Sequence, residues 1–98
     1  MEVIVWKAAK LDMFEAGNWL EEQQAGQGRK FIQEVESTFL RISLFPFASI
    51  LHARGFRTIV VTKYKYLILF RVKKKRIEVF AVIHGARDRS SWEHRVPK

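Results

Sequence analysis

The chain has 98 residues, which is the length of one domain, so residues 1–98 are treated as a single domain. Nearly half of the residues are apolar (48%) and none is cysteine, which excludes a disordered chain, a disulfide framework and thiol or cysteine–zinc chemistry. The 18 lysines and arginines against 10 acidic residues give a net charge of +8, which favours an anionic partner, either nucleic acid or an acidic protein segment.

Targeting and metal-binding signals are lacking in the sequence. No apolar run approaches the ~18 residues that span a membrane, and Glu2 stands where a signal peptide would carry basic residues. A chain without cysteine is compatible with a reducing compartment, so we expect a cytoplasmic protein without a membrane partner. The three histidines show no ligand-like spacing, so neither a metal nor a cofactor is expected.

The beginning of the chain predicts a strand followed by a helix. Residues 3–6 (VIVW) are β-branched and aromatic, which is typical of a strand. Asp12 is expected to cap the helix, because Glu15 follows three residues later in the reciprocal capping position. The helix carries an apolar stripe at helical spacing, formed by Met13, Ala16 and Leu20.

A second helix is predicted after the glycines of QQAGQG, which end the first one in a tight link. Its apolar stripe recurs at spacings of three, four and three residues, at Ile32, Val35, Phe39 and Ile42. Pro46 ends this region, because proline lacks the amide hydrogen that a helix needs. The short link predicts an antiparallel helical hairpin.

From Gly55 onward the apolar period is two residues, which predicts three strands: FRTIVVTK, YLILFRV and RIEVFAVIH. The short links TKYK and KKKR make neighbouring strands antiparallel. In the last strand the period places one set of residues on one face (Ile77, Val79, Ala81 and Ile83) and another on the opposite face (Phe80, Val82 and His84). The sheet is apolar on much of both faces, and the helical hairpin is the only cover expected.

The elements together predict an α+β fold: an N-terminal strand, then an antiparallel helical hairpin packed on a mainly antiparallel sheet that ends in a three-strand meander. A short C-terminal helix is expected, with Ser90 as its cap and Glu93 in the matching position.

Basic residues gather at the two ends of this meander. An up-down-up order places Lys63, Lys65, His84 and Arg87 at one end, about 20–25 Å from Arg54, Arg57 and the KKKR turn at the other. The cations predict a surface for phosphate groups or an acidic peptide. The residues expected to bind a target or nucleic acid are Lys63, Lys65, Arg71, Arg87 and Arg89. The KKKR turn is interpreted as a solvated hairpin turn, and Arg71 in mid-strand requires a partner, for which Glu78 is the candidate.

His84 has two interpretations. As a general base or acid it would act with Lys63 or Lys65 and with Arg87 in the cleavage of RNA. In the structural interpretation its ring bonds the backbone where the strand ends, and Gly85 permits a sharp turn. The structural interpretation is favoured, because we expect no tyrosine or carboxylate nearby.

Most of the chain resembles the ParE/RelE superfamily of toxins from bacterial type II toxin–antitoxin pairs, also called plasmid-stabilisation proteins, and the C-terminal half carries the strongest part of the likeness. The likeness is carried by an arginine that opens the first meander strand (Arg57), by the YLILFRV strand, and by V-x-H-G-x-R-D at residues 82–88. The segment KAAKLDMFEAGNWL resembles the first helix of the family.

This resemblance implies one of two activities. ParE-type members inhibit DNA gyrase, whereas RelE-type members cut messenger RNA on the ribosome, and Arg57, His84 and Arg87 would be the catalytic residues if this chain were RelE-like. After Arg87 the sequence DRSSWEHR offers no tyrosine and no immediate histidine, so the ParE branch is favoured. The resemblance also implies an antitoxin, expected to be acidic and helical. A non-toxic binding module is a third alternative, and homo-oligomerisation is left open.

Overall fold

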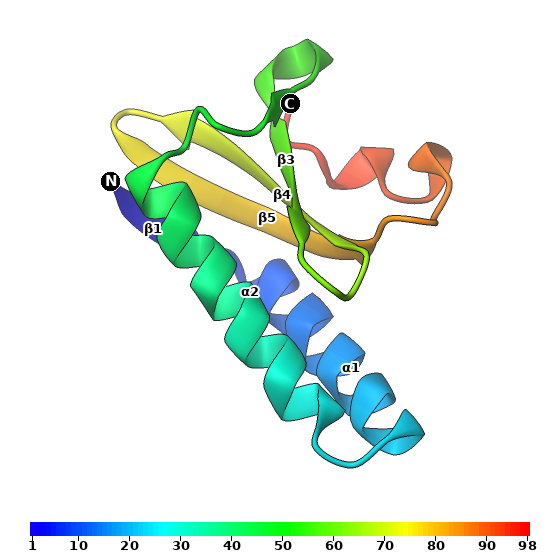
Figure 1. Ribbon diagram of the computed structural model, residues 1–98. Helices are drawn as coiled ribbons and strands as arrows, with labels where there is room; N and C mark the ends of the chain where they lie inside the picture. Colours follow the sequence, from blue (N-terminus) through cyan, green and yellow to red (C-terminus); the bar gives the residue numbers. More distant parts are fainter.

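The computed structural model describes residues Met1–Lys98 and has the predicted α+β architecture (Figure 1). Strand β1 (Glu2–Val5) leads into helix α1 (Lys7–Gln23), which a short link joins to the antiparallel helix α2 (Gln27–Leu44). The strands that follow are β2 (Ile50–Leu51), β3 (Arg57–Val61), β4 (Tyr66–Lys73) and β5 (Arg76–His84). Three 3₁₀ turns complete the chain, at Ala53–Gly55, Arg89–Ser91 and Glu93–Arg95.

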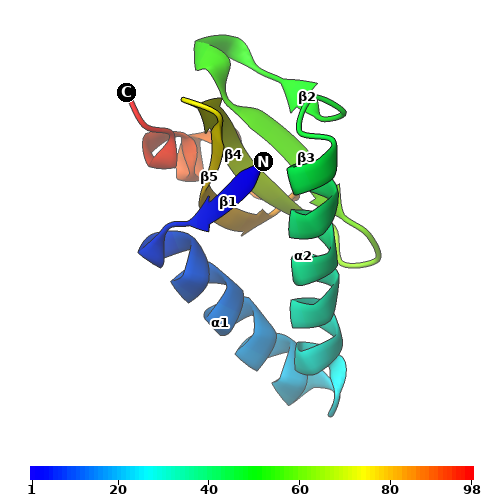
Figure 2. The same ribbon diagram turned by 90° about the vertical axis from the view of Figure 1, so that its left-hand side faces the viewer.

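The five strands form one sheet in the order β1-β5-β4-β3-β2, and the two helices lie on one of its faces (Figure 2). All neighbouring strands are antiparallel except β1 and β5, which are parallel in the register Val5↔Val79. The meander is the predicted one, whereas the two-residue edge strand β2 was not expected. No helix has both the length and the apolar character that crossing a membrane requires.

Asp12 does not cap helix α1, so this prediction was wrong. The helix begins five residues earlier, at Lys7, and Trp6 occupies the cap position without a side-chain hydrogen bond. The Asp12 carboxylate instead accepts hydrogen bonds from the Val82 amide (2.9 Å) and from the Arg95 guanidinium (2.8 Å). The carboxylate thereby accepts a hydrogen bond from a β5 amide that lies past the end of the neighbouring strand β1.

The predicted apolar stripes of both helices form the core between the hairpin and the sheet. Ala16 on α1 is buried, as are Phe31, Val35 and Ile42 on α2, and the remaining members of the stripes are partly buried against them. Pro46 follows two residues after α2 ends, as expected.

A β-bulge changes which side chains of β5 face the helices. Leu69 pairs with Ala81 and Phe70 with Val79, so Phe80 is an extra residue on β5. The alternation therefore shifts by one residue: Val79 and Val82 both join the helix-side core, while Ala81 packs on the opposite face. The prediction that Ala81 and Ile83 share a face with Val79 was wrong.

The opposite face of the sheet has a second core, which the C-terminal segment covers. Trp92 and Val96 pack there on Phe56, Phe80 and the outward residues of β4 and β5. The prediction that the hairpin is the only cover was therefore wrong. The C-terminal helix takes the form of two 3₁₀ turns, preceded by Asp88 and Trp92, and Ser90 caps neither of them.

Candidate functional site

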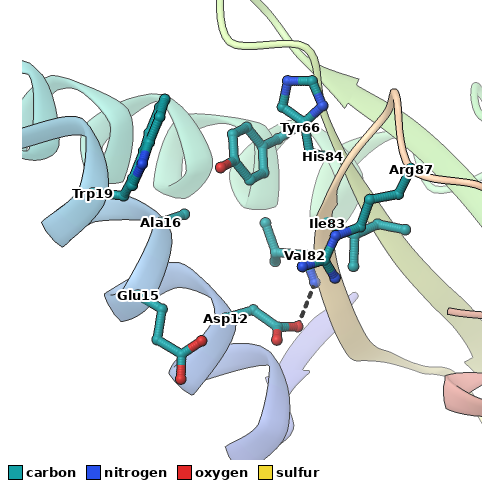
Figure 3. Close-up of a pocket in the computed structure, with 9 residues that line it drawn as sticks. All are labelled: Asp12, Glu15, Ala16, Trp19, Tyr66, Val82, Ile83, His84 and Arg87. Carbon is teal, nitrogen blue, oxygen red and sulfur yellow. Dashed lines mark hydrogen bonds between the residues drawn. The ribbon is translucent and has the colours of Figure 1, made fainter. Parts of the chain in front are cut away.

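A pocket of about 210 Å³ lies between α1 and the end of β5 (Figure 3). Asp12, Glu15 and Trp19 line it from α1, one helical turn apart, so they share one side of the helix. The opposite wall contains Tyr66 and His84, which are directly opposed in the pairing of β4 with β5.

His84 hydrogen-bonds the backbone, as the structural interpretation expected. Its Nδ1 accepts a hydrogen bond from the Ala86 amide at 3.1 Å, so Nε2 carries the proton of the neutral ring. The ring also meets Tyr66 edge-on, with the ring centroids 5.1 Å apart. The expectation that no tyrosine or carboxylate lies nearby was wrong, because Tyr66 and the two acidic residues of α1 line the same pocket.

The Tyr66 hydroxyl is a hydrogen-bond donor at neutral pH. Burial raises the pKa of this phenol above its ordinary value of 10.0, and the positive charge of Arg87 acts in the opposite direction without cancelling the effect of burial. Figure 3 shows Arg87 reaching from the loop after β5 towards the pocket. Arg87 is exposed and forms no ion pair, so its charge is available to a partner.

Gly85 joins this pocket to the turn between β3 and β4. Its amide donates a 2.7 Å hydrogen bond to the Lys65 carbonyl, and a Cβ at this position would lie 2.9 Å from the same oxygen. A side chain is thus excluded by close approach of two backbone segments. The contact brings Lys63 and Lys65 to the end of the sheet that holds His84 and Arg87, which is the predicted grouping.

Arg57 lies elsewhere. In the sheet it pairs with Phe70, which pairs with Val79, so it is five residues along the strands from His84, or about 16 Å. Its guanidinium donates to the Ser49 carbonyl (3.3 Å) and lies 5.0 Å from the Phe47 ring centroid. The structure therefore does not bring Arg57 into one pocket with His84 and Arg87.

Arg71 and Arg89 are engaged on the face of the sheet away from the hairpin. The predicted pairing of Arg71 with Glu78 is confirmed, with Nε 2.7 Å from Oε1. The hydrogen bond from Arg71 holds the pKa of Glu78 below its usual value, and Arg76 adds to the effect. Arg89 lies 5.6 Å from the ring centroids of Phe56 and Trp92 and 3.6 Å from Glu93.

Comparison with known proteins identifies the family. The family model described as "ParE toxin of type II toxin-antitoxin system, parDE" matches residues 3–89, which is most of the chain. The chain belongs to the ParE toxin family. The resemblance found in the sequence is thereby confirmed. No curated protein matches the chain.

A solved structure of the chromosomal ParDE toxin–antitoxin system from P. aeruginosa is similar to this ParE-family chain. The TM-score is 0.66 and the sequence identity 16%, and the alignment covers 86% of this chain and 95% of the other. At this identity the likeness shows a shared fold.

A group of exposed apolar side chains on this ParE-family chain escaped the sequence reasoning. Six apolar side chains at the end of α2, in the link that follows and on β2 are 59% to 67% exposed. They are Leu40, Leu44, Phe45, Phe47, Ile50 and Leu51, and we name them the α2–β2 apolar surface. The run LFPFASIL (residues 44–51), which contains all of them except Leu40, was their signal in the sequence.

Proposed function

We propose that this ParE-family chain is the toxin of a type II pair, that it inhibits DNA gyrase in the cytoplasm, and that a cognate antitoxin holds it inactive. The observation that carries the proposal is the family match over residues 3–89. The matched region includes His84 and Arg87, and the latter presents an unpaired charge beside the pocket. Inhibition then rests on binding, and the chain need not catalyse a reaction.

The antitoxin is proposed to cover the α2–β2 apolar surface. Soluble monomers rarely expose an apolar patch of more than a few hundred Å² unless a partner covers it. Arg41 is exposed next to Leu40 in the chain, and Arg57 stacks on Phe47 within the surface. An apolar centre with cations around it fits an amphipathic segment that carries acidic residues, and the net charge of +8 favours its approach.

Cleavage of messenger RNA is the second candidate, and one observation favours it. The Tyr66 hydroxyl, the His84 ring and Arg87 lie around a single pocket, which supplies the types of group needed for acid–base chemistry at a phosphate. The separation of Arg57 from these groups favours gyrase inhibition instead.

Two assays separate these candidates. The purified chain is added to a gyrase supercoiling reaction and to a translating extract whose messenger is mapped by primer extension. We expect loss of supercoiling with an intact messenger, and Tyr66→Phe should retain this activity. Messenger cuts that disappear in Tyr66→Phe would establish the nuclease instead. No effect in either assay would favour the third alternative, a non-toxic binding module.

Arg87 is tested by a neutral substitution. Arg87→Gln should abolish gyrase inhibition while the thermal unfolding midpoint stays unchanged, because the side chain is exposed and unpaired. Arg29→Gln is the matched control, since Arg29 is also exposed and lies on α2. An Arg87→Gln variant as potent as the unmodified chain would show that the pocket does not face the target.

A further inference from the structure

Five residues other than glycine have backbone conformations in the left-handed region, and all five are basic. They are Arg54, Lys63, Lys65, Lys74 and Lys75, with φ between 53° and 78°. Glycine and asparagine adopt this conformation at lower cost than residues with long side chains. The chain thus retains cations at positions where an uncharged residue would fit the backbone better, and retained strain of this kind points to a function.

The two lysine turns differ in their surroundings. Lys74 and Lys75 form a two-residue hairpin turn of the type that twisted strands favour, which accounts for their conformation. The turn with Lys63 and Lys65 instead lies against the end of β5, through the hydrogen bond between Gly85 and Lys65.

Four unpaired cations lie in this second turn or beside it. A hollow of about 410 Å³ on one side of it is lined by Lys63 and by Lys30 of α2, and another on the far side is lined by Lys65 together with His84. Arg87 follows two residues after Gly85, and none of the four cations forms an ion pair. We name Lys30, Lys63, Lys65 and Arg87 the basic ridge.

We propose that the basic ridge binds the phosphodiester backbone of DNA, so that the toxin contacts the DNA held by its target enzyme as well as the enzyme. The inference rests on the proposed inhibition of gyrase, an enzyme that works on DNA. Phosphate contacts are made by lysine, arginine and polar side chains, and the hollow beside Lys63 is lined by Gln27, Gln33 and Tyr64 together with one carboxylate, Glu34. The centres of protein–protein interfaces are depleted in lysine, which makes an acidic protein segment the poorer fit.

Asparagine substitutions remove the charges without disturbing the fold, because asparagine tolerates the left-handed conformation. Lys63→Asn/Lys65→Asn is the test variant. Lys74→Asn/Lys75→Asn is its matched control, since it removes the same charge from residues of the same conformation at the opposite end of the sheet. Thermal unfolding of both variants checks that the fold is kept.

Binding is measured by fluorescence anisotropy with the full chain and a labelled duplex of about 20 base pairs, over about 50 to 200 mM salt. Four phosphate contacts predict a slope of about −3.6 for log K against log salt concentration, and loss of two contacts should bring it to about −1.8. We expect the slope of the control variant to stay near that of the unmodified chain. Equal changes in both variants, or no binding by the unmodified chain at the lowest salt, would overturn the inference.

The same variants distinguish DNA from an acidic peptide as the partner. They also separate a failure of this inference from a failure of the proposed function. If Lys63→Asn/Lys65→Asn weakens binding of a polyglutamate peptide as much as that of DNA, the ridge recognises acidic protein and the inference is wrong. If the unmodified chain inhibits gyrase and the test variant inhibits it equally, the inference fails while the proposed function stands. DNA binding that depends on the ridge in a chain without effect on gyrase would contradict the proposed function alone.

Discussion

At the scale of single residues, Glu78 is the one buried acidic side chain in this basic chain. It lies on β5 and accepts hydrogen bonds from Arg71 (2.7 Å) and Arg76 (3.3 Å), and the Arg71 guanidinium also lies 5.6 Å from the Trp6 ring centroid. A buried carboxylate with two such partners is costly to remove, because the arginine that remains loses its counter-charge in a partly dry environment.

Glu78→Gln should therefore lower the free energy of unfolding by on the order of 2 kcal/mol at pH 7. The folded-state pKa of Glu78 lies below its ordinary value of 4.5, so the stabilisation is complete above about pH 4.5 and is lost as the pH falls through the lowered folded-state pKa. Urea unfolding at pH 7 and at lower pH measures both effects. The difference in the free energy of unfolding between Glu78→Gln and the unmodified chain should become smaller as the pH falls.

Glu36→Gln is the control for this prediction, because Glu36 is exposed on α2 and has no hydrogen-bond or ion-pair partner. Its effect on stability should be small at every pH. A pH-independent difference between Glu78→Gln and the unmodified chain would show that Glu78 is not the titrating group.

At the scale of elements, the two helices are joined by more than their apolar stripes. The Glu21 carboxylate on α1 accepts hydrogen bonds from the Gly26 and Gly28 amides (2.8 and 3.0 Å), so one helix caps the N-terminus of the other. A Cβ on Gly28 would collide with the Gly17 carbonyl, whereas a Cβ on Gly17 would find its nearest neighbour at 3.6 Å.

Gly28→Ala and Gly17→Ala should therefore act in opposite directions. Gly28→Ala forces the helices apart and should destabilise the fold by about 1–3 kcal/mol. Gly17 lies inside α1, and an added Cβ there would make ordinary van der Waals contacts. Gly17→Ala should therefore stabilise the fold by about 0.5–1 kcal/mol. Urea unfolding midpoints with unchanged slopes would report both. Stabilisation by both substitutions would contradict the close approach of the two helices at Gly28.

The elements that sequence patterns predicted well are those whose side chains repeat with a fixed period, such as the stripes of α1 and α2. The predictions failed where a tertiary contact decided the outcome. Asp12 has the sequence context of a cap, but its carboxylate is used by Val82 and Arg95, which are distant in the chain. The bulge at Phe80 breaks the two-residue period without a glycine or proline to signal it.

The pocket was predicted only in part, again because tertiary contacts bring some of its residues together. Arg87 and His84 stand out in the sequence because His84 ends the last strand and Arg87 follows three residues later. Tyr66 and Glu15 become visible only when the register of β4 with β5 and the position of α1 are known. Counting back from the KKKR link, where Lys73 pairs with Arg76, would have placed Tyr66 opposite Ile83, because the bulge at Phe80 shifts the register by one residue.

At the scale of the whole molecule, two surfaces lie at opposite ends of α2. The basic ridge includes Lys30 in its first turns, and the α2–β2 apolar surface begins at Leu40 and continues past Leu44, where the helix ends. Leu44 lies fourteen positions after Lys30, which is about 21 Å of helix. The proposed antitoxin and nucleic-acid contacts therefore use different parts of the surface, and each should respond to its own substitutions.

Phe45→Ser tests this separation. Phe45 is 67% exposed, so the substitution should leave stability nearly unchanged, but it removes the most exposed apolar side chain of the proposed antitoxin surface. We expect the affinity for the cognate antitoxin to fall about 30-fold, the effect of a typical hot-spot side chain, in isothermal titration calorimetry. Phe14→Ser is the matched control, because Phe14 is 66% exposed on α1 and lies outside that surface. Antitoxin binding that responds to Phe14→Ser and not to Phe45→Ser would move the docking surface to α1, and a large loss in Lys63→Asn/Lys65→Asn would show that the two surfaces serve one partner.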